Sequence, residues 1–570
     1  MKSKTKTCQN CKIKFTIEPE DFEFYKKIDV PEPTFCPDCR MQRRMVVHNI
    51  IELYKRKCDF SGKEIISMYH SDSPYKIYES SIWNSDKWDP MEYAKDYNFN
   101  KPFFEQFKEL KLDVPRSHNL NINSVNCDYC ALVVDCKDCY LCSGNHSENC
   151  AYSIVGLCKN CFDSFWLLKS ERCYENSFSN QNYNVYFSQY SDNCIDSAFL
   201  YDCRNCQNCF GCVNLRHRKY HIFNESYTKK DYQKEIKKYY IGDYNNLEKI
   251  KKQFEKFKLK FPKKYARIYN SNNVSGNDIK DTKNCYHCFF TAEGVENCKY
   301  IWSGGYNLKD SYDVFDGGTN SELIYESATA GRNLQKVYFS VNIIDNVYDI
   351  QYSDTCFSSS SLFGCVGLKH KKYCILNKQY TKEKYNKLIV EIKEHMNKMP
   401  YVDKKGRVYK YGEFFPIEFS TFDYNKTFAQ ELFPLTKEQV IKRGYRWYNK
   451  PKPEYKPTIK ANNLPINIKE VNKSMLKEVI ECKNISSGCV GTGVFRIIPQ
   501  ELEFYKKHNI SLPRLCPECR YQEHIKQRNP IKLWKRQCMK KGCNNTFQTT
   551  YSPDRKEIVY CEKCYNKEVS

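Results

Sequence analysis

The chain has 570 residues, of which 28% are charged and 41% hydrophobic, and its formal net charge is +23. This length predicts several domains, and the composition excludes collagen, coiled-coil and disordered classes. No stretch approaches the about 18–20 consecutive apolar residues of a membrane helix, and the N-terminus lacks the apolar core of a secretory signal. We therefore expect a cytoplasmic protein with no membrane contact.

The 33 cysteines are unusual for a chain of this kind. Cytoplasmic thiols stay reduced, so such cysteines are read first as metal ligands or as buried small residues, and only then as disulfides. The first repeat in the chain supports metal ligands. Residues 15–42 resemble residues 495–522 at a constant offset of 480, and LYKRKC ending at Cys58 matches LWKRQC ending at Cys538. Residues 1–82 and 482–570 therefore contain the same duplicated module.

Each terminal module contains Cys-Pro-x-Cys, in which a tight turn places two thiolates side by side for a tetrahedral zinc site. The opening pair of the second copy is wider, because Cys482 and Cys489 lie seven positions apart. A further set at the C-terminus closes with CEKC. We predict zinc ribbons that hold about three Zn²⁺ ions, with the ligands Cys8, Cys11, Cys36 and Cys39, then Cys482, Cys489, Cys516 and Cys519, then Cys538, Cys543, Cys561 and Cys564.

The N-terminal counterpart of the third site has lost its ligands. Cys58 is retained, but Glu79 and Ile82 stand where the CEKC thiolates would be. One cysteine cannot hold a structural zinc ion. We therefore expect residues 53–82 to keep the ribbon fold without the metal.

A second repeat organises the middle of the chain. Residues 210–232 resemble residues 363–385 at an offset of 153, and each copy ends a block of short units such as NCDYC and NCFGC at steps of mostly 10–12 residues. Short strands with polar corners predict two parallel β-helices, block A at 118–225 and block B at 271–377. Two units per coil would give coils of 22–24 residues. Cys and Ser suit inward positions, and Asn suits corners where side-chain amides stack.

The cysteines from Cys127 to Cys142 also allow a metal cluster. In block B, Val, Tyr or Ser replaces most of the equivalent cysteines, and a metal ligand cannot be exchanged for Val, whereas a ladder residue can. We favour buried reduced thiols.

The remaining segments are a helical or irregular connector at 83–117, a basic helical connector at 226–270, a basic helix at 378–400 and a linker with a short helix at 401–481. Thr228, Thr381 and Thr436 are expected to cap helices. The stretch PKPEYKP at 451–457 predicts an extended linker. The predicted fold class is thus mostly β and multidomain, with two solenoids and basic helices between duplicated ribbons.

The positive charge is segregated. Residues 226–270 carry 14 basic and 5 acidic side chains, and residues 378–570 carry 39 and 21, whereas both solenoid blocks are mildly acidic. Such segregation fits a nucleic-acid or acidic-partner surface. An AT-rich genome also raises the lysine content, so charge alone does not decide. Basic side chains that follow the ribbon cysteines are the expected phosphate contacts: Arg40, Arg43, Arg44, Arg520, Lys526, Arg528, Lys535 and Arg536.

Closed four-cysteine sites have no open coordination position, so catalytic zinc is not expected. Asp313, Asp316, Asp345 and Asp349 do not form a diagnostic cluster, and His146, His217, His287 and His370 have no assigned partner. We therefore expect a non-enzymatic scaffold whose ribbons bind nucleic acid or a ribonucleoprotein. The alternative is a structural or protein-docking assembly with protein partners on the solenoid faces, and the third is a β-helix carbohydrate-active enzyme. Ribbon arginines paired with solenoid carboxylates would favour the second.

The motifs CPDCRMQRR, LYKRKCDFSGKEI, SDKWDP, CFGCVNLRHRKYHIFN and LWKRQCMKKGC resemble a family of uncharacterised multi-zinc-ribbon proteins from small, mostly uncultured bacteria. This resemblance covers nearly the whole chain and implies zinc binding, but no activity. The solenoids are more distantly similar to the small β-helix of cyclase-associated proteins and tubulin cofactor C, in architecture only.

Overall fold

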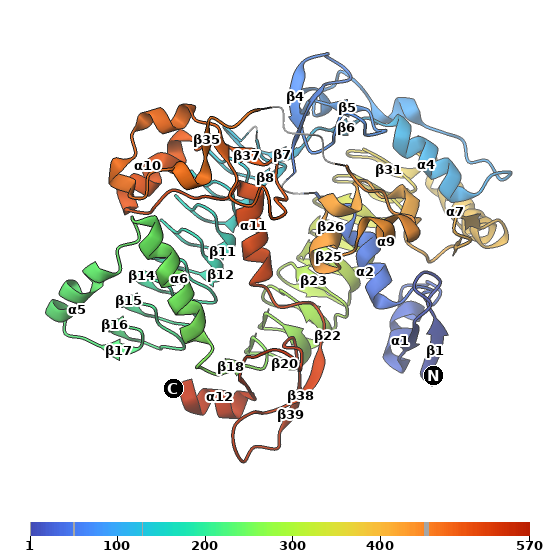
Figure 1. Ribbon diagram of the computed structural model, residues 1–570. Coiled ribbons are helices and arrows are strands. Elements are labelled where there is room, and N and C mark those ends of the chain that lie inside the picture. Colours follow the sequence, from blue (N-terminus) through green and yellow to red (C-terminus); the bar gives the residue numbers. More distant parts are fainter. Residues whose placement is uncertain (1, 50–51, 128, 450–454, 570) are drawn as a thin grey trace.

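The computed structural model describes residues 2–49, 52–127, 129–449 and 455–569. The described chain is mostly β, with two β-solenoids in the middle and cysteine groups near both ends, as the sequence predicts. Figure 1 shows the two solenoids side by side, with the ribbons packed against them.

Solenoid A is a stack of short parallel strands from block A. The strands form two sheets, β7 to β12 and β13 to β17, in which parallel neighbours lie one coil apart, as in Leu120 with Leu132 and Tyr183 with Ile195. A short antiparallel strand, β17, closes the C-terminal end. Its strands are β7 (Leu120–Ile122), β8 (Leu132–Val134), β9 (Ser143–Asn145), β10 (Ile154–Gly156), β11 (Phe165–Leu168), β12 (Ser177–Asn180), β13 (Tyr183–Tyr186), β14 (Ile195–Ala198), β15 (Gln207–Phe210), β16 (Lys219–Ile222) and β17 (Glu225–Ser226).

Solenoid B repeats this architecture with longer strands. Its parallel pairs include Tyr312 with Tyr325, and β32 closes its end in antiparallel fashion. Its strands are β19 (Ile268–Tyr269), β20 (Asn272–Asn277), β21 (Ile279–Lys280), β22 (Lys283–Phe289), β23 (Trp302–Gly304), β24 (Leu308–Lys309), β25 (Tyr312–Thr319), β26 (Ser321–Arg332), β27 (Leu334–Tyr338), β28 (Val341–Ile343), β29 (Val347–Gln351), β30 (Ser360–Phe363), β31 (Lys372–Ile375) and β32 (Lys378–Gln379).

The predicted coil of 22–24 residues is wrong, because paired residues of neighbouring coils are only 11–13 positions apart. The reason lies in the backbone. About every third residue has a positive φ, as at Asp202, Asn205 and Asn208, with φ of 49°, 52° and 52°. Each such left-handed residue turns the chain sharply. Four corners therefore close one coil, and one sequence unit makes a whole coil.

This triplet geometry explains the cysteine spacing within the solenoids. The residue after each corner points inward, so Cys203, Cys206 and Cys209 follow the three corners just named and are all buried. The Cys-x2-Cys spacing here reflects the distance between corners. It does not mark a metal-binding turn.

Inward thiols and hydroxyls bond to the backbone. The Cys206 thiol donates to the carbonyl of Arg204 at 3.4 Å, and Ser188 donates to Tyr186 at 2.9 Å while accepting from the Leu200 amide at 3.0 Å. Cys and Ser therefore serve the same structural role, as predicted. The expected amide stacks at corners are also present: Asn273 donates to Asn284, and Asn284 donates to Asn297, both at 3.1 Å.

The basic helices begin where the capping residues predict. The side chains of Thr228, Thr381 and Thr436 accept backbone N–H groups at the starts of α5 (Lys229–Glu235), α7 (Lys382–Lys398) and α9 (Lys437–Lys442). α5 packs on β16 and α7 packs on β31, so each covers the last coil of its solenoid. α6 (Tyr244–Lys258) lies along the flank of solenoid A, where Phe254 contacts Phe199 with ring centroids 5.7 Å apart.

The segment between the first ribbons and solenoid A contains α4 (Phe103–Asp113), which packs on solenoid B through Phe103 and Phe363. Residues 401–449, predicted as a linker, bury Tyr409, Phe415 and Phe428 in the same core. Residues 451–454 of the predicted extended linker lie outside the described residues. The shorter elements are η1 (Pro90–Tyr93), β33 (Tyr401–Val402), β34 (Val408–Tyr409), η2 (Ile236–Lys238), η3 (Ile417–Phe419), η4 (Tyr424–Lys426), α8 (Phe428–Leu432), β35 (Ile459–Lys460), η5 (Ala461–Asn463), η6 (Ile468–Glu470) and η7 (Lys473–Lys477).

Each terminal module contains two ribbons. The first ribbon of the N-terminal module has β1 (Lys4–Thr7), β2 (Lys14–Ile17), α1 (Pro19–Lys27) and α2 (Pro37–Met45); that of the C-terminal module has β36 (Ile480–Glu481), β37 (Val494–Phe495), α10 (Pro499–His508) and α11 (Pro517–Lys526). The second ribbons are β3 (Tyr54–Lys57), β4 (Glu64–Ser67), β5 (Ile77–Tyr78) and α3 (Ser80–Trp83), and β38 (Trp534–Gln537), β39 (Thr546–Thr549), β40 (Val559–Tyr560) and α12 (Glu562–Val569).

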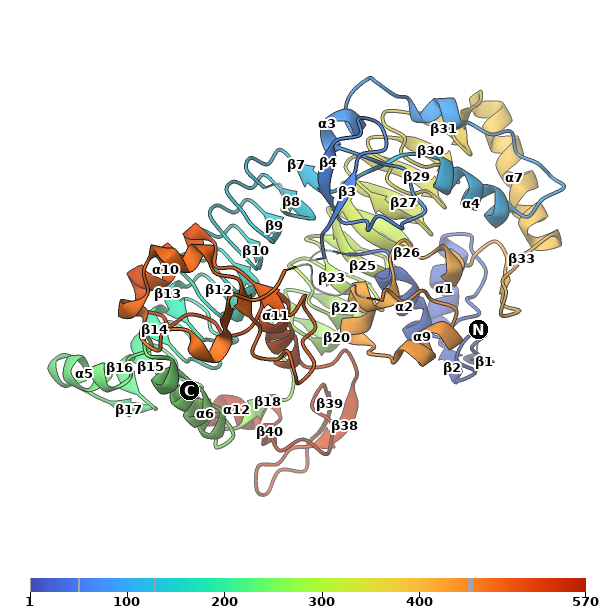
Figure 2. The same cartoon turned by 45° about the horizontal axis from the view of Figure 1, so that its top comes forward.

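The two modules cross over between the solenoids. The N-terminal first ribbon packs on solenoid B, where α2 contacts β25 and β26, and the C-terminal first ribbon packs on solenoid A (Figures 1 and 2). One strand of each second ribbon pairs with the strand that leads into the other solenoid. β5 pairs with β6 (Arg116–Ser117) before solenoid A, and β40 pairs with β18 (Lys263–Lys264) before solenoid B. Each module therefore bridges both solenoids.

Candidate metal centres and their arginine contacts

Three groups of four cysteines come together, and they contain all twelve predicted ligands. Within each group the four sulfur atoms lie within 4.8 Å of one another. Each group can therefore hold a metal ion. Among the described residues, no solenoid cysteine belongs to a comparable set.

The first group is built by a hairpin and the start of a helix. Cys8 follows β1, and Cys36 precedes α2, with Pro37 in its first turn. The backbone N–H of Cys36 donates to the Cys8 sulfur at 3.3 Å, and the side-chain amide of Asn10 donates to the Cys39 sulfur at 3.4 Å. The neighbouring Cys36 and Cys39 thiols hold the pKa of Cys8 well below its usual value. These contacts favour the thiolate form that binds metal.

The second group has the same geometry despite its wider opening. The Cys516 N–H donates to the Cys482 sulfur at 3.3 Å, and the Cys489 sulfur lies 3.6 Å from that of Cys516. The extra residues form a turn that still returns Cys489 to the group. In the third group, the Cys561 N–H donates to the Cys538 sulfur, again at 3.3 Å.

The degenerate ribbon keeps this backbone without the thiols. The Glu79 N–H donates to the Cys58 sulfur at 3.3 Å, the same contact that Cys561 makes with Cys538. Where the third group has Cys564, Ile82 is buried beside Trp83 and Tyr78. Apolar packing therefore occupies the position that the metal centre has in the other copy.

The arginines after the first cysteine group are buried. Arg40, Arg43 and Arg44 are each 2% exposed or less. Arg40 and Arg44 contact the two oxygens of Asp313 at 2.8 and 2.9 Å, on a corner of solenoid B. Arg44 also contacts Glu326 at 3.2 Å, and Arg43 contacts Glu326 and Glu413, both at 3.4 Å. Three guanidinium groups thus face three carboxylates away from solvent.

The second cysteine group is followed by a simpler version of this contact. Arg520 is buried between Asp163 of solenoid A at 3.1 Å and Glu501 of its own ribbon at 2.9 Å. The Tyr505 hydroxyl also donates to Glu501 at 2.7 Å. Burial raises the pKa of Asp163 to about 7, although Arg520 opposes that shift.

The two docking contacts are structural equivalents. Phe24 stacks on Tyr312 with centroids 3.9 Å apart, and Phe504, which is 480 residues later, packs on Phe162 at 4.6 Å. The aromatic partner in each solenoid directly precedes the aspartate that receives the arginine. The ribbon repeat and the solenoid repeat therefore preserve one interface in two copies.

The predicted phosphate contacts are mostly unavailable. Arg40, Arg43, Arg44 and Arg520 are buried as described, and Arg528 is 8% exposed with its guanidinium 3.9 Å from Glu431. These positions contradict the expectation that the five arginines contact phosphates, because protein carboxylates already occupy them. Lys526 and Lys535 are exposed and Arg536 is half-buried, so for these three the role stays a prediction. The pairing of ribbon arginines with solenoid carboxylates is the arrangement that the sequence analysis associated with a structural or protein-docking assembly.

The aspartates and histidines singled out for catalysis do not converge. Asp313 binds the ribbon arginines, whereas Asp345 pairs with Arg332 at 2.8 Å and Asp316 accepts from Ser303 at 2.7 Å. The four histidines are separate left-handed corner residues of their solenoids: His146, His217, His287 and His370.

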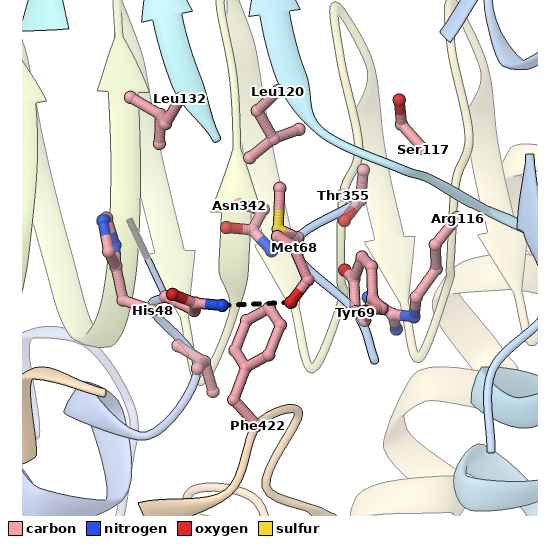
Figure 3. A pocket seen from close by; sticks show the side chains of 12 residues that line it. His48, Met68, Tyr69, Arg116, Ser117, Leu120, Leu132, Asn342, Thr355 and Phe422 are labelled. Atoms are coloured by element: carbon pink, nitrogen blue, oxygen red, sulfur yellow. Dashed lines mark hydrogen bonds between the residues drawn. The ribbon is translucent and has the colours of Figure 1, made fainter. Parts of the chain in front are cut away.

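A small cavity lies where the two solenoids and the linker after the first ribbon meet (Figure 3). Its lining includes His48, Leu120, Asn342 and Phe422, and the Asn49 amide donates to the Met68 carbonyl at 3.0 Å. The cavity volume is about 30 Å³. That space suits one or two water molecules and is far below that of a typical small-molecule site.

No protein-family model matches this sequence, and no curated protein matches it. Among solved structures, the chain is similar to one described as an acetyltransferase from Desulfovibrio desulfuricans G20, with 9% identity over 50% of this chain and 84% of that chain and a TM-score of 0.10. A TM-score this low carries no functional argument. Within the described part of the chain, no helix is both long enough and apolar enough to cross a bilayer.

Proposed function

We propose that this protein is a non-enzymatic zinc scaffold in which terminal ribbons clamp two β-solenoids into one rigid body. The observation that carries the proposal is the duplicated buried contact between ribbon arginines and solenoid aspartates. Arginines that are paired with buried protein carboxylates support a structural assembly, whereas a ribbon that binds nucleic acid would need the same arginines free to contact phosphates.

Zinc is the metal that fits the three groups best. Four cysteine sulfurs form a closed tetrahedral set, which is typical of structural zinc and leaves no position for a substrate. A metal bound there would link the folding of each small ribbon to its docking, because ribbons of this size have little core of their own.

The metal groups and the docking residues are adjacent in the chain. Cys39 and Arg40 share the first turn of α2, and Cys519 and Arg520 share that of α11. An ion held by Cys39 or Cys519 would therefore fix the start of the helix that carries the arginine into the solenoid. Loss of the metal would release both the helix and its buried charges.

The solenoid faces left free by the ribbons carry polar ladders, such as the stack from Asn273 to Asn297. We infer that a protein partner docks on these regular walls while the ribbons hold the two stacks in fixed orientation. Cytoplasmic location and kinship with the multi-zinc-ribbon family belong to the same proposal.

Native mass spectrometry and small-angle scattering test this proposal together. The purified chain should contain three zinc ions, and Cys39→Ser or Cys519→Ser should each remove one and increase the radius of gyration. Cys206→Ser is the matched control, because Ser occupies equivalent inward positions in the solenoids, and it should retain all three ions and the compact shape. Unchanged scattering after complete removal of zinc would contradict the clamp.

A further inference from the structure

A basic groove lies between α6 and the chain that follows Cys482, away from the arginine contacts that join the ribbons to the solenoids. One wall is the exposed face of α6, and Lys483 contributes the other. The lining residues are Tyr244, Asn245, Glu248, Lys249, Lys252, Gln253, Lys256 and Lys483.

Three lysines of this groove have no protein counter-charge. Among the described residues, no carboxylate lies within ion-pair distance of Lys249, Lys252 or Lys256, and all three side chains are exposed. Other lysines of the same helix are paired: Lys251 contacts Glu175 at 3.1 Å and Lys258 contacts Glu255 at 2.7 Å. With Glu248 as the one acidic lining residue, the groove has a net charge of +3.

The free lysines form one stripe on a helix that is held in place. Positions 249, 252 and 256 are separated by three and four residues and so share a helix face, and they span about 10 Å along the axis at 1.5 Å per residue. The opposite face of α6 buries Leu247, Ile250 and Phe254 against solenoid A. The charges are therefore presented at a fixed spacing by the scaffold.

The other lining groups are hydrogen-bonding side chains. Asn245 and Gln253 offer amides, and side chains of this kind, with lysine, make most contacts to phosphates and sugars. Stable protein interfaces are anchored in well-packed, desolvated pockets, mostly by aromatic and arginine side chains, whereas this groove is lined by lysines, amides and one carboxylate around a single tyrosine. The chemistry therefore favours a polyphosphate backbone over a peptide.

The one aromatic ring that lines the groove is already engaged, on one face by Arg514 and at its hydroxyl by Lys483. Lys483 Nζ lies 5.5 Å from the Tyr244 ring centroid and Arg514 Cζ lies 4.6 Å from it, and Lys483 donates to the Tyr244 hydroxyl at 2.9 Å. Single-stranded nucleic acids usually bind through bases stacked on free aromatic rings. Since Arg514 covers one face of Tyr244 and the lining has no second aromatic ring to continue a base stack, a duplex, whose bases are internal, fits the groove better.

We propose that this groove binds the sugar–phosphate backbone of duplex nucleic acid, without reading its sequence, through Lys249, Lys252, Lys256 and Lys483. The inference goes beyond the clamp, which does not involve these residues. It also moves the nucleic-acid contact away from the ribbon arginines, which are buried.

Fluorescence anisotropy with a zinc-loaded full chain and a labelled 20-base-pair DNA tests the proposal. Four phosphate contacts predict a slope of about −3.6 for log K against log salt, which is about a 150-fold loss of affinity from 50 to 200 mM salt. In K249Q/K252Q/K256Q one contact remains, so the loss over that range should be only about three- to fourfold. The control K382Q/K384Q/K387Q removes the same charge from α7, which is the counterpart of α5 on solenoid B, and should keep the wild-type slope.

Two results would overturn the proposal. One is equal slopes for the α6 and α7 variants, which would mean that the general positive charge of the protein attracts the DNA. The other is binding of a polyglutamate peptide of equal charge as tightly as the DNA, which would assign the groove to an acidic protein. Because each variant keeps all twelve cysteines and the docking arginines, scattering and zinc content should not change, so failure here is distinguishable from failure of the clamp.

Discussion

Replacement of Arg44 by methionine tests the buried docking contact most directly. Arg44 is fully buried and contacts Asp313 at 2.9 Å and Glu326 at 3.2 Å. In R44M, the two remaining guanidinium groups face three carboxylates, so one negative charge is buried without compensation. Breaking a buried ion pair in this way costs about 3–5 kcal/mol. We expect the first ribbon to detach from solenoid B at correspondingly lower urea.

The second variant restores the charge balance. In R44M/E326Q, two guanidinium groups face two carboxylates, and a neutral amide replaces the Glu326 partner. The cost should therefore be smaller than the sum of the single costs by about 1–3 kcal/mol, the range of coupling between residues in direct contact. Lys27→Met is the matched control. Lys27 also links the ribbon to solenoid B, through Asp310 at 3.1 Å, but it is half exposed, so its loss should cost less than about 1 kcal/mol.

Pulse proteolysis across a urea series, followed by mass spectrometry of peptides from residues 1–47, measures the opening free energy of the ribbon itself. This choice matters because a chain of several units need not unfold in a single transition. A cost below 1 kcal/mol for R44M, or simple additivity in R44M/E326Q, would refute the view that the arginine cluster holds the ribbon in place.

Three further outcomes follow from the same structure. In chemical unfolding, Asp163→Asn should lower the free energy of unfolding by less than about 1 kcal/mol, because burial raises the pKa of Asp163 to about 7 and leaves it half protonated at neutral pH. Asp313→Asn should lower it by about 3 kcal/mol, because Asp313 contacts two guanidinium groups. Equal losses for the two variants would contradict this reasoning. Burial lowers the pKa of Lys263 from its ordinary 10.5 to about 7. Between these pH values the unfolded chain binds more protons than the native one, so stability should rise with pH from about 7 to 10.5. In thermal unfolding, Lys263→Met should show a smaller increase of stability with pH, and an unchanged increase would rule out Lys263 as its origin. Gly317→Ala should destabilise solenoid B by about 2–4 kcal/mol, because φ is +101° and the new Cβ would lie 1.7 Å from the Ala330 carbonyl oxygen. Gly406→Ala is the control and should cost about 1 kcal/mol, because φ is +74° but the space around the new Cβ is open. Similar unfolding midpoints for the two variants would refute the steric argument.

Local patterns were sufficient for much of the fold. The cysteine groups could be predicted because their ligands lie on two short turns within one repeat, and the thiols of Cys36 and Cys39 share the start of a helix. The caps at Thr228, Thr381 and Thr436 could be predicted for the same reason, since a cap bonds only to the next few residues. The replacement of two ligands by Glu79 and Ile82 in the ribbon of Cys58 was visible from the repeat alone.

The coil length depended on the pairing between strands. A unit of about 12 residues is compatible with half a coil or a whole one, and the choice depends on whether the backbone turns sharply at every third residue. Asn and Asp tolerate that left-handed conformation, but Phe187 and Tyr190 adopt it too, against the usual preference. Stacking of coil on coil imposes this conformation, so composition could not reveal it.

Whether the ribbon arginines face solvent or buried carboxylates depends on contacts between distant parts of the chain. The repeats showed that Arg40 and Arg520 follow matching cysteine groups, and the composition showed that the solenoids are acidic. Arg40 lies beside Asp313 and Arg520 beside Asp163 because the fold joins residues that are 273 and 357 positions apart. A charged side chain has the same local pattern whether it faces water or a buried carboxylate, and that difference comes from the crossing of each ribbon onto the opposite solenoid.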